Sequence, residues 1–210
     1  MAGWSPGNGN KITIELLDKG DDAGGRGGGT YLGLNPGIIG WYNMRTFVES
    51  GKIDGIILHE MGHCFTLGRG GSFNVELAAH TMAYYVAEKT GTSGKDYWSI
   101  DNDYADMVKN YKTPLSWDDV DIYLWRCLWK FHKDTNWEPL KKTLRSYYNS
   151  SFKSLYDLNM YNSNATGRDG PWEFLERLSF FSKKNIETYF YKDLGTYVRK
   201  YYPEPKIVIN

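Results

Sequence analysis

The chain has 210 residues, of which 41% are hydrophobic and 24% are charged, and this composition supports a folded core and excludes a disordered polypeptide. Lysine plus arginine and aspartate plus glutamate each number 25, so the net charge is zero, which argues against a nucleic-acid binder that relies on a strong positive field. No apolar run approaches the length that spans a bilayer. We therefore expect one globular domain over residues 1–210 without a membrane span.

The cysteines and the chain ends give information on the cellular compartment of the protein. Cys64 and Cys127 can form one pair or remain two free thiols, and both possibilities stay open. The start of the chain lacks the basic and apolar regions of a signal peptide, which fits a cytosolic protein or a piece of a longer secreted chain. The abrupt opening at Trp4 and the linker-like tail from Pro203 favour the second possibility, so we expect a domain excised from a longer chain.

The front of the chain, about residues 1–50, is predicted to be rich in β-structure. Lys11–Leu17 alternates as a strand does, and Tyr31–Leu34 and Ile38–Tyr42 are short apolar runs that can add further strands. The glycine-dense segment Gly20–Gly33 lacks the Gly-Lys-Ser/Thr ending of a phosphate-binding loop, and no helix signal follows it directly. We predict a mobile surface loop or a cluster of turns there.

The remainder of the chain is predicted to be mainly helical. Apolar residues at helical spacing predict a helix over about 53–67 and a second helix from about Asn74 to Lys89. A third is expected to begin after an N-cap at Ser116, with Asp119 three residues on. Further helices are expected near 137–149, 171–183 and 185–194, the last of them stopped by Gly195.

Residues 59–63 read His-Glu-Met-Gly-His, which matches the pattern His-Glu-x-x-His. On a helix, His59 and His63 lie one turn apart on one face, so their imidazoles can bind one zinc ion. Glu60 can reach a zinc-bound water instead of the metal, and can act as general base and then as proton donor to the leaving group. The alternative is a pair of ordinary surface histidines with a glutamate between them.

A catalytic zinc site needs a third protein ligand. A histidine six positions past the second one, with a glycine three positions past it, would supply that ligand, but those positions are Arg69 and Thr66. Glu76 lies thirteen positions after His63, across a glycine-rich turn that lets the next helix fold back. Its apolar neighbours make an unpaired carboxylate unfavourable there, so we predict that Glu76 is the third ligand, with a solvent-facing role as the alternative and Glu88 as the substitute.

Other polar residues near this segment have open roles. His80 shares a helix face with Glu76 and can orient a metal ligand through a hydrogen bond, or can be a satisfied core histidine. The oxyanion of peptide hydrolysis needs a donor besides zinc, for which Tyr84, Tyr85 and His132 are candidates. With 17 tyrosines in the chain, no single donor is selected.

His59-Glu60-x-x-His63 followed by Glu76 resembles the gluzincin metallopeptidases, and more narrowly the enhancin-like, mucin-targeting peptidase family. The likeness rests on His-Glu-Met-Gly-His-Cys-Phe at 59–65 and on Val75-Glu76 leading into Met-Ala-Tyr-Tyr-Val at 82–86. Looser helical similarity at 124–148 and 174–197 extends the resemblance over about residues 30–200.

The resemblance implies an α+β, zincin-like fold, in which a small N-terminal β-containing subdomain packs on a mainly helical C-terminal subdomain of about 72–200, with the zinc site between them. It implies a secreted or cell-surface zinc endopeptidase that hydrolyses glycoproteins such as mucins. His59, His63 and Glu76 would bind one zinc ion, and Glu60 would be the base. We expect a monomer whose partner is a protein or glycoprotein substrate and not a nucleic acid.

Two other functions stay open. One is a non-catalytic glycan- or glycoprotein-binding module on a zincin scaffold, which would use the aromatic residues that make up 16% of the chain. Glu60 argues against it, because a structural zinc site needs no base. The other is a metal hydrolase for an ester or amide of a small molecule, which the motif does not reject. For the peptidase, an edge strand near Ile38–Tyr42 is expected to pair with extended substrate.

Overall fold

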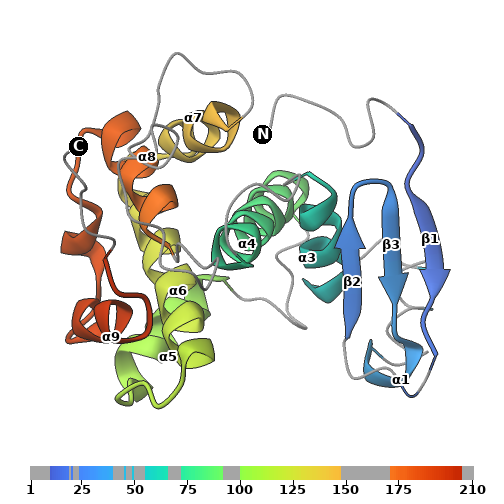
Figure 1. The fold of residues 1–210 in the computed structure, drawn as a ribbon, viewed down its shortest axis with the longest axis horizontal. Coiled ribbons are helices and arrows are strands. Elements are labelled where there is room, and N and C mark those ends of the chain that lie inside the picture. Colours follow the sequence, from blue (N-terminus) through green and yellow to red (C-terminus); the bar gives the residue numbers. More distant parts are fainter. Residues whose placement is uncertain are drawn as a thin grey trace, which may run out of the picture. The chain divides into compact units, whose positions relative to one another are not determined.

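The computed structural model describes residues 10–18, 20, 24–39, 45, 49, 55–65, 72–91, 100–147 and 171–204. These residues form a small sheet and a larger set of helices, so the predicted α+β class is confirmed (Figure 1). The chain divides into two compact units, one of residues 1–68 and 78–99 and the other of residues 69–77 and 100–210. Within the described ranges, no helix combines the length and the apolar character that a membrane crossing requires.

The first unit contains a three-stranded sheet in the order β1-β3-β2, formed by β1 (Thr13–Leu16), β2 (Gly25–Gly28) and β3 (Tyr31–Leu34). The central strand β3 runs parallel to β1 and antiparallel to β2. Gly29, with φ of 54°, opens the two-residue turn between β2 and β3, where glycine adopts the left-handed backbone without steric penalty. One of the three strands, β2, is therefore formed by a segment that has almost no side chains.

This arrangement corrects the predicted surface loop at Gly20–Gly33. That segment includes β2 and the first part of β3, whereas the predicted strands at Lys11–Leu17 and Tyr31–Leu34 are confirmed as β1 and β3. Glycine has a low strand propensity, but backbone pairing with β3 decides the structure of β2.

The predicted strand at Ile38–Tyr42 is wrong for its first two residues, which belong to the short helix α1 (Pro36–Ile39). Residues 40–42 lie outside the described part of the chain. The side-chain Oδ1 of the buried Asn35 accepts a hydrogen bond of 2.8 Å from the N–H of Gly37. An asparagine followed by proline is a helix-start signal, and it outweighs the strand propensity of the isoleucines.

Helix α3 (Gly55–Cys64) lies within the predicted range of 53–67 and carries the whole His-Glu-x-x-His segment. It runs beside β2 (Figure 1). Leu32 and Leu34 of β3 form a buried core with Ile57 of α3, and partly buried apolar residues, Ile12, Ile56 and Met61, pack around them. Burial of these side chains holds the helix against the sheet.

Helix α4 (Ser72–Thr90) extends the predicted helix of about 74–89 by two residues at its start and one at its end. Gly91, with φ of 68°, follows its end in the left-handed conformation that commonly terminates helices. A Cβ atom at Gly62 of α3 would lie 2.5 Å from the carbonyl oxygen and 2.8 Å from Cα of Ala79 in α4. The two helix backbones therefore touch at a position where only glycine fits.

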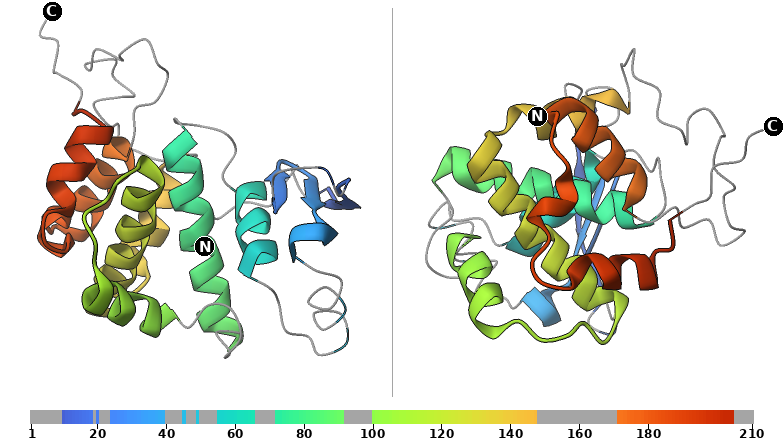
Figure 2. Two further views of the ribbon diagram at one scale, coloured as in Figure 1. Left: turned by 90° about the horizontal axis from the view of Figure 1, so that it is seen from below. Right: turned by 90° about the vertical axis from the view of Figure 1, so that its left-hand side faces the viewer.

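The second unit gathers helices around α6 (Trp117–Thr135), as Figure 2 shows. The other elements are α5 (Ile100–Asn110), α7 (Glu138–Ser146), α8 (Trp172–Ser182), the 3-10 helix η2 (Ile186–Tyr189) and α9 (Leu194–Tyr201). Val120, Leu124 and Phe131 on α6 are fully buried in the core of this unit. The predicted N-cap of α6 is confirmed, because the Ser116 side chain accepts a hydrogen bond from the N–H of Asp119. The Asp119 carboxylate in turn accepts a hydrogen bond from the N–H of Ser116.

The predicted helix over 185–194 is wrong. The segment forms η2, which begins after Asn185, and then a break in which Lys192 has φ of 48°. Gly195, which was expected to stop the helix, is the second residue of α9. The side-chain oxygen of Asn185 accepts a hydrogen bond from the N–H of Glu187, so the chain starts a short 3-10 turn there and no long helix. Helix α5 was not predicted.

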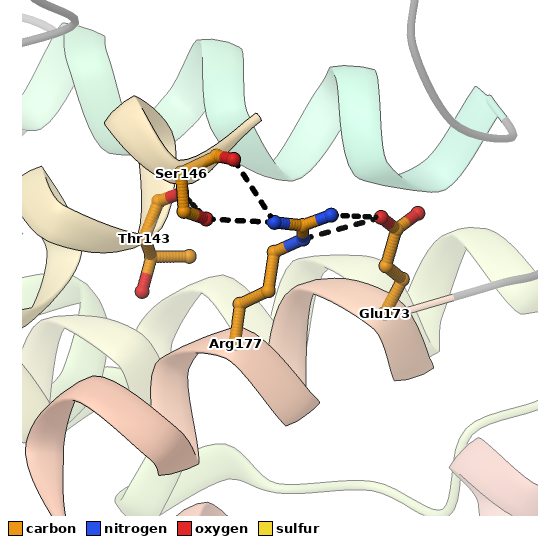
Figure 3. A network of polar contacts seen from close by, with 4 residues as sticks. All are labelled: Thr143, Ser146, Glu173 and Arg177. Carbon is orange, nitrogen blue, oxygen red and sulfur yellow. Dashed lines mark hydrogen bonds and ion pairs between the residues drawn. The ribbon is translucent and has the colours of Figure 1, made fainter. Parts of the chain in front are cut away.

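A buried arginine joins α7 to α8 (Figure 3). Nη2 of Arg177 lies 2.8 Å from Oε1 of Glu173, one turn earlier on α8. Nη1 donates to the carbonyl oxygen of Ser146 at 3.1 Å and to its hydroxyl at 2.9 Å. The guanidinium also lies over the ring of Tyr147, 4.2 Å from its centroid. Arg177 therefore supplies donors to the last carbonyl of α7, which has no partner within the helix.

Candidate metal centre

The two histidines of the motif face each other on α3, as the four-residue spacing requires. Nε2 of His59 and Nε2 of His63 are 2.9 Å apart, and the two rings meet edge to face with centroids separated by 4.6 Å. His63 is buried and His59 is partly buried. Two imidazole nitrogens thus converge on one point at the side of the helix.

This pair fits a zinc ion in donor type and in separation. Zinc binds imidazole nitrogen at about 2.0–2.1 Å with tetrahedral angles, which places two such nitrogens roughly 3.3 Å apart. The observed Nε2–Nε2 separation of 2.9 Å differs from that value by a few tenths of an ångström, which a small rotation of either ring removes. The convergent nitrogens can therefore serve as two of the protein ligands.

Glu60 lies beside the histidine pair. A carboxylate oxygen of Glu60 and one ring nitrogen each of His59 and His63 all lie within 4.8 Å of one another. The residue is only 8% exposed, which is unusual for a glutamate. An acid in this position is close enough to exchange a proton with a water molecule held between it and the histidines.

His80 approaches the site from α4. Its ring centroid lies 4.0 Å from that of His59, and the residue is 7% exposed. The close crossing of α3 and α4 at Gly62 and Ala79 explains this approach, because Ala79 immediately precedes His80. The structure thus brings His80 to the first predicted ligand, where it can orient that ring or offer a nitrogen to the ion.

Glu76 precedes His80 by one helical turn on the continuous helix α4. A carboxylate oxygen of Glu76 lies within 4.8 Å of ring nitrogens of His59 and His80, and these three residues form a second group able to hold a metal. His59 belongs to both groups. Neither group joins Glu76 directly to His63, so the predicted trio of His59, His63 and Glu76 is connected through His59.

The remaining candidates belong to neither of these groups. Among the described residues, Glu88 is in neither group, although it was the substitute ligand. Among the oxyanion candidates, Tyr84 lies near the site, with its ring centroid 6.3 Å from that of His80. His132 belongs to the second unit, where it stacks on Trp137 with centroids 3.8 Å apart.

Cys64 directly follows His63, and its thiol is buried and free. Its Sγ–H donates to the carbonyl oxygen of Tyr31 at 3.3 Å. Burial raises the pKa of the Cys64 thiol, and the nearby charge of Glu60 adds to this rise, while a backbone hydrogen bond from Gly28 opposes it. Cys127 is likewise free and buried, which settles the open question of a disulfide in favour of two thiols.

Sequence reasoning missed the glycines that shape this site. Gly25 and Gly27 of β2 lie against Glu60 and His63, and Gly62 lies against α4. The signal was present as a glycine-dense stretch near the motif, but glycine density alone does not distinguish a mobile loop from a strand that needs close backbone approach.

Comparisons of the chain with protein-family models, with curated proteins and with solved structures find no match.

Proposed function

We propose that the protein is a zinc-dependent endopeptidase with a zincin-like catalytic domain, and that its substrates are glycoproteins such as mucins. The observation that carries this proposal is the convergence of the two Nε2 atoms, 2.9 Å apart, with the buried carboxylate of Glu60 beside them. The glycoprotein substrate and an extracellular or cell-surface location are supported by the sequence resemblance alone.

His59 and His63 bind the ion in this proposal, and Glu76 completes the set of protein ligands with His80 beside it. The ion, when bound, polarises a scissile carbonyl and makes water more acidic. Glu60 accepts the proton of the attacking water and then donates it to the leaving amine.

Strand β2 is the proposed docking edge for substrate. In the described part of the sheet it is a terminal strand, and it runs beside the motif helix. An extended peptide can add to such an edge through main-chain hydrogen bonds, which would place a scissile bond near Glu60.

The decisive experiment compares Glu60→Gln with the wild type. The amide keeps the size of the side chain but cannot act as a base, so we expect turnover of casein and mucin to fall by at least roughly 10²–10⁴-fold. Zinc content, measured by atomic absorption after dialysis, should stay at the wild-type level. Glu138→Gln is the matched control, because Glu138 lies on α7 in an exposed ion pair with Lys141.

Each other outcome points to a different function. Undiminished turnover in Glu60→Gln would refute the proposed base. Wild-type protein that binds zinc but leaves casein and mucin intact over long incubations would favour the binding module. Cleavage of small esters or amides without cleavage of any peptide would favour the third class, and comparison of glycosylated with bare peptides would show whether glycans matter.

A further inference from the structure

Two glycines of β2 lie against α3 where a Cβ atom has no room. At Gly25, a Cβ atom would lie 2.5 Å from Cγ and 3.0 Å from Cδ of Glu60. At Gly27, it would overlap the carbonyl oxygen of Glu60 and lie 3.0 Å from Cβ of His63. Real Cβ atoms essentially never come closer than 3.0 Å to such neighbours. Gly25 therefore faces the side chain of Glu60, whereas Gly27 faces the helix backbone.

The requirement for glycine is confined to one face of β2. Successive residues of a strand point to opposite faces, so positions 25 and 27 share the face toward α3. Gly28 belongs to the opposite face, and a Cβ atom there would meet nothing within 4 Å. The contrast shows that close approach to α3 is what excludes a side chain at positions 25 and 27.

The side chain of Glu60 occupies the space that a side chain at position 25 would fill. Side chains settle in staggered rotamers, and only rotation about Cα–Cβ moves Cγ, so a Cβ atom at Gly25 forces Glu60 to rotate about that bond. Such a rotation moves the carboxylate away from its place beside His59 and His63. A catalytic group needs placement within about 0.5 Å, so even part of this movement matters.

We propose that Gly25 is a positioning residue for Glu60, because its lack of a side chain holds the Glu60 carboxylate beside His59 and His63. This inference rests on the proposed function for its catalytic consequence. The conformational part, that Gly25 acts through the Glu60 side chain, stands on the packing alone and can be measured without turnover.

The first measurement uses the full chain loaded with zinc and compares Gly25→Ala with Gly20→Ala. A Cβ atom at the exposed Gly20 meets nothing within 4 Å, so this control should keep the wild-type rate. For Gly25→Ala we expect kcat on labelled casein to fall by roughly 10²-fold with little change in KM, as for a reacting group displaced by about 1 Å.

The second measurement titrates each apoprotein with cobalt(II) and follows its visible absorption. Gly25→Ala should bind cobalt with less than the roughly 10-fold loss that follows a disturbed ligand. Gly27→Ala should lose affinity clearly, because its Cβ atom displaces the backbone that carries His59 and His63. The difference in cobalt affinity between the two variants distinguishes movement of the Glu60 side chain from movement of the helix backbone.

The third measurement is a double-mutant cycle in thermal stability. Gly25→Ala should lower the unfolding midpoint in the wild type but much less in a Glu60→Ala background, where Cγ and Cδ are absent. The carbonyl oxygen of Gly33, 3.1 Å from the same Cβ position, accounts for a small residual effect. Gly28→Ala should shift the midpoint equally in both backgrounds.

The outcomes are separable. Equal midpoint losses for Gly25→Ala in both backgrounds, or cobalt affinity lost as strongly as in Gly27→Ala, would overturn the proposal and make Gly25 a structural residue. Wild-type kinetics in Gly25→Ala would overturn it as well. If the wild type hydrolyses no substrate, the proposed function fails, and the stability cycle and cobalt titration still decide whether Gly25 holds Glu60.

Discussion

Cys127, on α6, is a fully buried thiol whose ionisation is strongly changed by burial. Burial raises the pKa of its thiol to about 12, and a backbone hydrogen bond from Tyr191 offsets only part of this rise. The thiolate is the reactive form, so the native thiol is almost entirely unreactive near neutral pH.

We expect Cys127 to resist labelling by a disulfide reagent at pH 8 in the native protein and to react fully in denaturant. A Cys64→Ser variant isolates its signal. Because the folded state holds the thiol proton more tightly than the unfolded chain, the resulting stability is complete below about pH 9. It is lost as pH rises toward 12, by up to about 1.4 kcal/mol per unit.

Unfolding free energies measured at pH 8 and pH 10 test this sign. The wild type should lose more stability over this interval than Cys127→Ala, which has no thiol to ionise. An equal loss in both proteins, or fast native labelling, would contradict the burial of this group.

At the scale of elements, Arg177 ties α8 to the end of α7 (Figure 3). Its side chain is 1% exposed and that of Glu173 is 9% exposed, so solvent does not screen the pair. Removing one partner of a buried pair leaves the other charge uncompensated, whereas removing both can be nearly neutral.

We therefore expect Arg177→Met to destabilise the protein by about 3–5 kcal/mol in chemical denaturation. The double variant Arg177→Met with Glu173→Met should be more stable than the single variant, because no unpaired carboxylate remains. If the double variant is the less stable of the two, Glu173 stabilises the protein even without Arg177, because the contact of Arg177 with Ser146 is absent from both variants.

Prediction from sequence succeeded for elements whose signals are local. The capping box of Ser116 and Asp119 needs only four residues, and the structure contains it. The motif helix was equally accessible from its apolar spacing. Strand β2 was not accessible, because its glycines adopt their structure only through pairing with β3. The Asn35–Pro36 helix start was readable in principle, but the following isoleucines favoured a strand.

In the candidate site, too, some features follow from local sequence patterns and others only from tertiary packing. The i, i+4 spacing was enough to predict that His59 and His63 face each other. The approach of His80 to His59 depends on the crossing of α3 and α4 at Gly62, which is a packing fact that no local pattern contains. The predicted ligand role of Glu76 stays a prediction.

At the scale of the whole molecule, metal binding should change stability. A ligand that binds only the folded state at 100 times its Kd adds about 2.7 kcal/mol to the free energy of unfolding. We expect EDTA to lower the thermal midpoint of the zinc-loaded protein, and His59→Ala to remove this dependence on metal.

His132→Ala is the matched control for that measurement, because His132 is a buried histidine of the second unit that stacks on Trp137. Its midpoint should fall through lost packing, yet EDTA should still lower it further. An EDTA effect that is the same in His59→Ala and in the wild type would place the metal elsewhere.

The four residues of β2 carry a single side chain, that of Arg26, which is exposed. A chain laid along this strand would meet peptide groups that all amino acids share, and hardly any surface that could tell one residue from another. Substrate selection by the proposed peptidase would then depend on whether a polypeptide can adopt an extended conformation. Tightly folded proteins would escape it, and unstructured stalks would be cut at many places regardless of their local composition.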